Sequence, residues 1–251
     1  MGDEAITICG DVVIKTGSPE LMCIEVEKTR RAHEISKQCG LFRVPEVLDY
    51  DESTGTAKFE YLRDIRTLRE VIACGAGAKS VMAKLGQSLA IVHKNLKLPE
   101  NMVVPLPKNY CLAGTEVFLH GDLGLRNVCV SVNNSKIAIL DWRTTEKLGE
   151  YATHGSRYFD IMWFVYNLFY RPIKRTRYQA SSPAAPMAET FIHAYFSTTD
   201  YAYNHEEFVS YMKRFLDMRL STRKNAGQFK RRLLLVPSHM KLRRFISSFH
   251  L

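Results

Sequence analysis

Short hydrophobic runs in the first sixty residues predict four strands with one helix between them. The runs lie at residues 6–9, 12–15, 44–50 and 56–62. The first two flank the dipeptide Gly10-Asp11, which is typical of a two-residue hairpin turn. Residues 18–38 have a charged helical pattern that begins at Ser18 and ends before Gly40. We therefore expect a small antiparallel sheet with one helix at the start of the chain.

Helical periodicity dominates the rest of the chain. Within residues 79–96, Val81, Leu85, Leu89 and Val92 recur at spacings of three and four. The other expected helices lie at residues 64–74, 157–169, 189–196, 206–220, 228–235 and 240–249. The second, larger part of the molecule should therefore be mostly helical.

One polar loop interrupts this pattern at residues 120–127, with the sequence His-Gly-Asp-Leu-Gly-Leu-Arg-Asn. It leads into the apolar runs 128–132 and 137–140, which a short polar segment separates, and this arrangement predicts a hairpin. Because a hairpin brings its two ends together, Asn127 and Asp141 should lie side by side.

Carboxylate and amide oxygens held in this way suit Mg²⁺, which keeps several waters and binds together with phosphates. Asp122 lies on the same loop and could accept the proton of an incoming hydroxyl group. A base, metal ligands and fixed spacing are the requirements of phosphoryl transfer. The alternative interpretation is a surface turn with incidental acidic residues.

The pattern His-Gly-Asp-x-x-x-x-Asn followed by Leu-Asp-Trp at 140–142 resembles the catalytic segment of the aminoglycoside phosphotransferase family. These are small-molecule kinases of the protein-kinase-like fold. The resemblance, over roughly residues 12–168, implies an α+β, two-lobed fold with a nucleotide-binding lobe at 1–62 and a catalytic and substrate lobe at 63–251. It also implies transfer of the γ-phosphoryl group of ATP or GTP, with Mg²⁺, to a hydroxyl group of a small-molecule acceptor.

The same resemblance implies a role for each polar residue of the motif. Asp122 is the expected catalytic base, and Asn127 and Asp141 are the expected Mg²⁺ ligands. His120 should support the loop through hydrogen bonds, and Asp160 should accept backbone hydrogen bonds from it. A buried carboxylate requires such donors, and the aromatic residues that follow Asp160 are expected to lie in the core.

Lys15, at the end of the second strand, is expected by this resemblance to contact the nucleotide phosphates. The helix at 18–38 offers two acidic partners for it, Glu25 and Glu27. Residues 24–28 are similar to the family pattern in which the second acid pairs with the lysine, so we expect Glu27. An ordinary strand lysine and a solvated helical glutamate are the alternatives.

Glu60, Tyr61 and Leu62, by the likeness of their neighbours to the family, begin the hinge whose backbone meets adenine. Lys15 comes so early that only one hairpin fits before it, so the first strand and its phosphate-covering loop should be truncated or absent. Backbone N–H groups of such a loop normally hold phosphate. A second hypothesis is therefore a weakly active or inactive kinase-like module with a binding or regulatory role.

Composition limits the class of protein and its expected location. With 46% hydrophobic and 24% charged residues, the chain is ordinary for a globular protein. Six scattered cysteines predict reduced thiols, and the lack of a signal-peptide pattern adds to the expectation of a cytoplasmic protein. The longest apolar run, 161–170, has about half of the ~20 residues that a membrane span requires.

The net charge of +9 is concentrated after Lys213, where Asp217 is the single acid. This basic C-terminal region predicts either a solvated face or contact with an anionic surface. It also leaves open a large anionic acceptor, such as a lipid-linked sugar or RNA.

Overall fold

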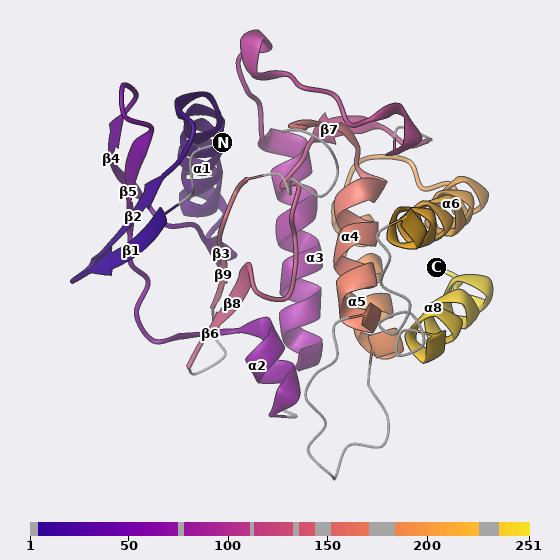
Figure 1. Cartoon of the computed structure of the whole chain (residues 1–251). Helices are drawn as coiled ribbons and strands as arrows, with labels where there is room; N and C mark the ends of the chain where they lie inside the picture. The colour runs from indigo at the N-terminus through magenta and orange to yellow at the C-terminus, as the bar shows by residue number, and fades with distance from the viewer. Residues whose placement is uncertain are drawn as a thin grey trace.

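The computed structural model describes residues 5–74, 78–110, 113–132, 136–143, 152–170, 184–225 and 236–251. The chain has a mixed α+β fold, as expected. In Figure 1 a small sheet and one helix form the left part of the molecule, and most of the helices form the right part. The boundary between residues 62 and 63 remains a prediction.

The N-terminal sheet contains the strands β1 (Ala5–Cys9), β2 (Val12–Thr16), β4 (Val47–Asp51) and β5 (Thr56–Glu60). Their order is β1-β2-β5-β4, and every neighbouring pair is antiparallel. The predicted hairpin and the two later strands are confirmed. Within the described residues, no strand pairs with the outer edge of β1, so the strand that carries Lys15 lies one strand from the edge.

Helix α1 (Pro19–Cys39) covers this sheet. Its residues Met22 and Val26 form a buried cluster with Ala57 and Phe59 of β5. Spacings of three and four residues place Met22, Glu25, Val26 and Thr29 on one buried face of the helix. This face of α1 therefore packs against β5.

A second sheet joins the two parts of the molecule. Its strands are β3 (Phe42–Arg43), β6 (Ile65–Thr67), β8 (Val128–Ser131) and β9 (Ile137–Ile139). The order is β3-β9-β8-β6, with β3 parallel to β9 and the other pairs antiparallel. The hairpin of β8 and β9 is the predicted one, and it fixes the position of the polar loop that precedes it.

The predicted helix at 64–74 is wrong in its first part, because residues Ile65–Thr67 form β6 and pair with β8. Helix α2 begins only at Leu68 and spans Leu68–Ala73. Its start is fixed by a capping box, in which Thr67 and Glu70 exchange side-chain and backbone hydrogen bonds.

The helical part is built around α3 (Ala78–Asn95) and the apolar helix α4 (Tyr158–Tyr170). It also contains α5 (Ala184–Thr198), α6 (His205–Asn225) and α8 (Val236–Ser248). Helices α3 and α5 come close at Gly86, where a Cβ atom would lie 2.3 Å from the carbonyl oxygen of Phe191. Above them lie η1 (Glu100–Met102), η2 (Lys108–Tyr110) and the antiparallel pair β7 (Glu116–Phe118) and β10 (His154–Ser156).

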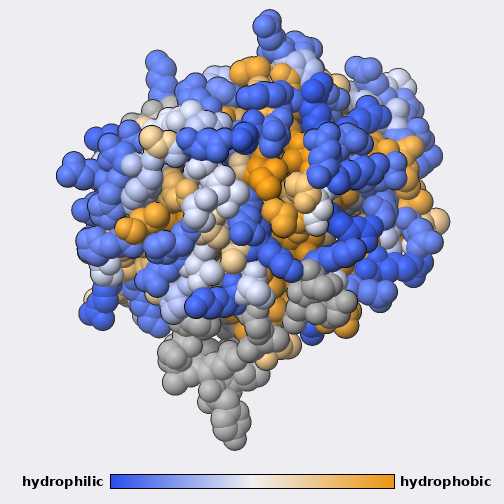
Figure 2. Space-filling view, turned by 180° about the vertical axis from the view of Figure 1, so that it is seen from behind, coloured by the Kyte–Doolittle hydropathy of each residue, from blue (hydrophilic) through white to orange (hydrophobic). Residues whose placement is uncertain are grey.

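The surface is largely polar. On the face shown in Figure 2, hydrophilic residues cover most of the area and hydrophobic residues gather in a band near the middle. None of the helices in the described part of the chain is both long and apolar enough to cross a membrane.

Candidate catalytic site

Asp160, in the first turn of α4, holds the backbone of the loop 120–127. One carboxylate oxygen of Asp160 accepts a hydrogen bond from the amide of His120 at 2.7 Å, and the other accepts one from the amide of Gly121 at 2.9 Å. The ring of His93 bonds the same carboxylate at 3.1 Å. Burial by itself raises the pKa of Asp160, but these bonds hold it below its usual value. The contacts expected of Asp160 are therefore present.

His120 connects the loop to the end of β9. Its Nδ1 atom accepts a bond from the amide of Asp122 at 3.2 Å, so Nε2 carries the proton and donates to the carbonyl of Leu140 at 3.1 Å. Burial lowers the pKa of His120 to about 4, and the ring is neutral near pH 7. Gly121 has a φ of +89°, which favours glycine at this bend.

Asp122 is oriented by two side chains. Its Oδ1 atom accepts a hydrogen bond from Trp163 Nε1 at 2.6 Å, and Oδ2 lies 3.3 Å from Asn127 Nδ2. Asn127 Nδ2 also donates to the backbone carbonyl of Asp122 at 2.9 Å. Because the amide nitrogen of Asn127 faces Asp122, its carbonyl oxygen points away and can meet a cation.

Asp141 lies across the open end of the hairpin from Asn127. The amide of Leu140 donates to the carbonyl of Asn127 at 2.7 Å, so the two expected ligands are attached to directly paired backbone. Asp141 has a φ of +59°, a strained conformation for a residue with a side chain, and such strain is often found at functional sites.

Lys15 links the N-terminal part to this site. Its ammonium lies 2.9 Å from Asp141 Oδ1 and 2.5 Å from Glu25 Oε1. Burial lowers the pKa of Lys15, but the two carboxylates outweigh this effect and raise it. Burial by itself raises the pKa of Asp141, but Lys15 outweighs this effect and lowers it, so Asp141 stays ionised. The site thus contains one shared cation between two acids.

The expectation that Glu27 pairs with Lys15 is wrong. Glu25 is the partner, and Glu27 instead binds Arg31 at 2.6 Å, one turn along the same helix. Side chains of residues two apart in a helix point in directions that differ by roughly 200°. Only one of the two acids, Glu25 or Glu27, can therefore face the sheet. Glu25 lies three residues from Met22 and one from Val26, on the buried face. This spacing was the signal in the sequence that could have identified it.

Lys28 is a further residue of the site that was not anticipated. Its side chain is fully buried, and its ammonium donates to the backbone carbonyl of His120 at 2.8 Å. Burial lowers its pKa to about 8, although Asp160, Glu25 and Asp141 act in the opposite direction. Burial also raises the pKa of Glu25, whose Oε2 atom has no hydrogen-bond partner among the described residues.

The expected hinge residues lie where the two sheets meet. The side chain of Glu60 forms an ion pair with Arg43 at 2.7 Å, and the amide of Tyr61 donates to the carbonyl of Asp11 at 2.9 Å. Leu62 is buried beside Cys129 and Ala138. Because the Tyr61 amide is already bonded, adenine would have to use other backbone groups of this segment.

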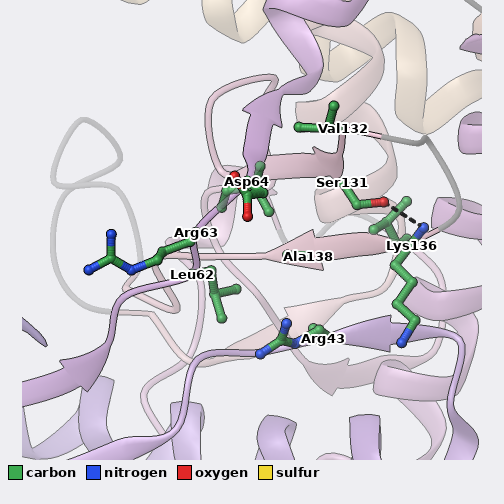
Figure 3. A pocket seen from close by; sticks show the side chains of 10 residues that line it. Arg43, Leu62, Arg63, Asp64, Ser131, Val132, Lys136 and Ala138 are labelled. Atoms are coloured by element: carbon green, nitrogen blue, oxygen red, sulfur yellow. Dashed lines mark hydrogen bonds between the residues drawn. The ribbon is translucent and has the colours of Figure 1, made fainter. Parts of the chain in front are cut away.

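A cavity of about 310 Å³ lies next to the hinge. Figure 3 shows Arg63 and Lys136 on opposite sides of it, with Arg43 at one end and Leu62 between them. Lys15, Asp122, Asn127 and Asp141 do not line it. The cavity is therefore separate from the cluster of polar residues around the catalytic loop.

Comparison with protein families gives one match. The model described as the phosphotransferase enzyme family (APH) matches residues 58–204, which includes the loop, the hairpin and Asp160. A comparison with curated proteins finds no match.

Several solved structures resemble the whole chain. A choline/ethanolamine kinase family protein from Mesorhizobium loti is 16% identical, with a TM-score of 0.56 over 98% of this chain and 85% of that chain. The gentamicin complex of APH(2")-IIa is 12% identical, with a TM-score of 0.57 over 99% of this chain and 89% of that chain. Amicoumacin kinase hAmiN is 11% identical, with a TM-score of 0.55 over 97% of this chain and 86% of that chain.

At these identities the structures show a common protein-kinase-like fold. The family model goes further, because it spans more than half of the chain and contains the segment in which Asp122, Asn127 and Asp141 were found. The chain thus belongs to the phosphotransferase enzyme family, and it has the fold of the kinases described above.

Proposed function

We propose that the protein transfers the γ-phosphoryl group of ATP or GTP, with Mg²⁺, to a hydroxyl group of a small-molecule acceptor. The observation that carries this proposal is one continuous set of contacts. Lys15 bridges Glu25 and Asp141, the amide of Leu140 next to Asp141 donates to the carbonyl of Asn127, and the side chain of Asn127 contacts Asp122. The structure of amicoumacin kinase hAmiN, which has the same fold, contains AMP-PNP and Ca²⁺.

Asp122 is the proposed base. Trp163 and Asn127 hold its carboxylate in one orientation, so it can receive the proton of an acceptor hydroxyl without first reorienting. Lys15 is the proposed contact of the nucleotide phosphates, with Glu25 keeping its ammonium in the cleft. Glu60, Tyr61 and Leu62 stay the proposed hinge, and His120 and Asp160 support the loop from the side of the core.

The residues present fit a divalent cation. Asn127 turns its carbonyl oxygen away from Asp122, and Asp141 is ionised with a 42% exposed side chain. These two residues would hold Mg²⁺ together with phosphate oxygens and water. Bound there, Mg²⁺ supplies charge neutralisation on the transferred group.

Asp122→Asn and Asp141→Asn test this function, since both keep the size of the side chain. We expect each to lower the rate of phosphoryl transfer by at least about 10²-fold. Asp122→Asn should keep its affinity for the nucleotide, because the proposed role of Asp122 is to receive the proton of the acceptor and not to hold the phosphates. The assay follows nucleotide consumption with choline, ethanolamine, glucosamine and aminoglycosides as acceptors, and Glu27→Gln is the control.

Full activity in both variants would contradict the assignment. A wild-type protein that binds no Mg·ATP at millimolar concentration and turns over none of these acceptors would instead favour the regulatory module.

A second candidate concerns the acceptor. Residues 213–251 contain eleven Lys and Arg and a single acid, whereas the net charge of the whole chain is only +9. The exposed members in the described part are Lys213, Arg214, Lys241, Arg243 and Arg244. This distribution favours an anionic surface or a large anionic acceptor near α6 and α8. A cytoplasmic location remains part of the same proposal.

A further inference from the structure

Trp163 contacts the proposed base from the core of the helical part. It lies on α4, three residues after Asp160, and its side chain is buried. Residues three apart share one face of a helix. That face holds the loop twice, because Asp160 binds the backbone of His120 and Gly121 while Trp163 binds the side chain of Asp122.

We propose that Trp163 is a positioning residue for Asp122 and that Arg219 holds the indole ring in place. This inference rests on the proposed function, in which Asp122 receives the proton of the acceptor. An N–H group that donates to a carboxylate forms a charge-assisted hydrogen bond, which is stronger than a bond between neutral groups. The 2.6 Å bond therefore selects one orientation of the carboxylate.

The two oxygens of Asp122 are consequently different. Oδ1 has the short bond to Trp163, and Oδ2 has the longer 3.3 Å contact with Asn127. A hydroxyl donor displaces the longer contact more easily than the shorter one. The geometry thus assigns Oδ2 as the oxygen that meets the acceptor proton, on the side of Asn127 and the proposed cation.

Arg219 supplies the second half of the arrangement. Its guanidinium carbon lies 4.8 Å from the ring centre of Trp163 and 5.4 Å from that of Tyr166. The residue is only 7% exposed, its Nε has no hydrogen-bond partner, and it forms no ion pair among the described residues. A buried polar group in this state requires an explanation.

Attraction between a cation and the face of an aromatic ring provides that explanation. The positive charge fixes the indole between α4 and α6, and it draws electron density from the ring. The indole N–H becomes a better donor to Asp122 as a result. In this way α6, remote in sequence from residues 120–127, contributes to the orientation of the base.

Trp163→Phe tests the proposal, because it keeps an aromatic ring and removes the N–H group. We expect the kcat to fall about tenfold with an unchanged KM for the nucleotide, since an orienting contact in the transition state is lost. The acid limb of the kcat–pH profile should move to higher pH, because the ionised form of Asp122 loses a donor. Arg219→Met should show the same two changes to a smaller extent, and Arg219→Lys should restore part of the activity.

Tyr158→Phe is the matched control. It removes a buried hydroxyl group of α4 that donates to Glu207 of α6 at 2.9 Å, and it does not contact Asp122. A general loosening of the α4–α6 contact would affect this variant as well. We expect its kcat and pH profile to equal those of the wild type.

A spectroscopic measurement keeps the proposal testable if Trp163→Phe folds poorly. The chain has only two tryptophans, so its folded state gives two indole N–H resonances. One of them should lie at low field and move upfield in Asp122→Asn. If neither responds to Asp122→Asn, or if Trp163→Phe has a wild-type kcat and pH profile, the inference fails. An inactive Asp122→Asn alongside those results would leave the proposed function intact, whereas a fully active Asp122→Asn would overturn the function itself.

Discussion

The ammonium of Lys15 depends on Glu25 for its position in the cleft. Glu25 is 1% exposed, and its contact with Lys15 is the shorter of the two that this lysine makes with acids. Neutralising it should leave Lys15 drawn towards Asp141 alone. The phosphates of a nucleotide would then meet a lysine that is displaced towards the proposed cation ligand.

Glu25→Gln and Glu27→Gln form a matched pair, since both acids lie on α1 and make one ion pair each. We expect Glu25→Gln to weaken Mg·ATP binding about tenfold, equivalent to about 1.4 kcal/mol. Glu27→Gln should change it by less than about twofold, because its partner Arg31 is a surface residue. Calorimetric titration of both variants with Mg·ATP measures the difference, and equal affinities would contradict the assignment of Glu25.

The residues of the loop could be identified from the sequence because their spacing is local. His120, Asp122, Asn127 and Asp141 lie within one loop and one hairpin, so a short motif fixes their neighbourhood. Trp163 could not be identified in this way. It reads as one aromatic residue in an apolar helix, and only the packing of α4 under the loop brings it to Asp122.

Among the elements, long helices and hairpins could be predicted because their hydrophobic periods extend over many residues. The strands β3 and β6 have two and three residues, too few to establish a period. Each exists because it pairs with the β8–β9 hairpin, which is distant in sequence. The start of α2, by contrast, has a local signal in the sequence, because Thr67 and Glu70 have the spacing of a capping box.

Helix α1 is tied to the catalytic loop by Lys28. The helix that carries Glu25 thereby keeps a fixed distance from the loop that carries Asp122. Lys28→Met keeps the length of the side chain and removes the ammonium. We expect kcat to fall while the free energy of unfolding at pH 7 stays equal or rises, because a buried charge with one acceptor is removed.

The pH dependence of stability tests the burial of this ammonium. The pKa of Lys28 is about 8 in the folded protein, against 10.5 for an unperturbed lysine. Between these two values the unfolded state binds more protons, so the contribution of Lys28 to stability rises with pH and is lost as pH falls through 8. Relative to Lys28→Met, the wild type should gain about 3 kcal/mol between pH 7 and pH 11.

Urea unfolding of both proteins across this range measures the gain. Lys37→Met is the control, since Lys37 lies on the same helix with a 59% exposed side chain. The difference in unfolding free energy between the wild type and Lys37→Met should stay constant between pH 7 and pH 11, because this variant keeps Lys28. A constant difference between the wild type and Lys28→Met at all pH values would contradict the buried ammonium.

In the whole molecule, the site is assembled from both parts of the chain. β2 and α1 supply Lys15 and Glu25, the loop and β9 supply the other polar residues, and α4 supports them from the core. The second sheet lies between these parts and fixes their relation. Only the tertiary fold could show that α1 contributes a second cation to this arrangement.

Charge is distributed unevenly over the same molecule. The excess of Lys and Arg lies after residue 212, and α8 presents Lys241 and Arg244 on its outer face while Leu242, Phe245 and Ile246 pack inward. Met240, beside them, is 64% exposed. Basic side chains next to an exposed apolar residue suit the headgroup region of an anionic membrane better than a nucleic acid.

We therefore expect the protein to bind vesicles that contain phosphatidylserine, with an affinity that falls steeply as salt increases, because exposed charges are screened. The double variant Lys241→Glu/Arg244→Glu should bind at least about tenfold more weakly, since each basic residue near such a surface contributes about 1 kcal/mol. Lys37→Glu/Lys97→Glu changes the net charge equally on exposed residues outside the basic region 213–251, and it should keep wild-type binding. Co-sedimentation at several salt concentrations measures all three proteins. If both double variants bind equally weakly, net charge alone explains the binding, and the assignment to α8 is wrong. If the protein binds RNA but not vesicles, a nucleic acid and not a membrane is the partner of this region.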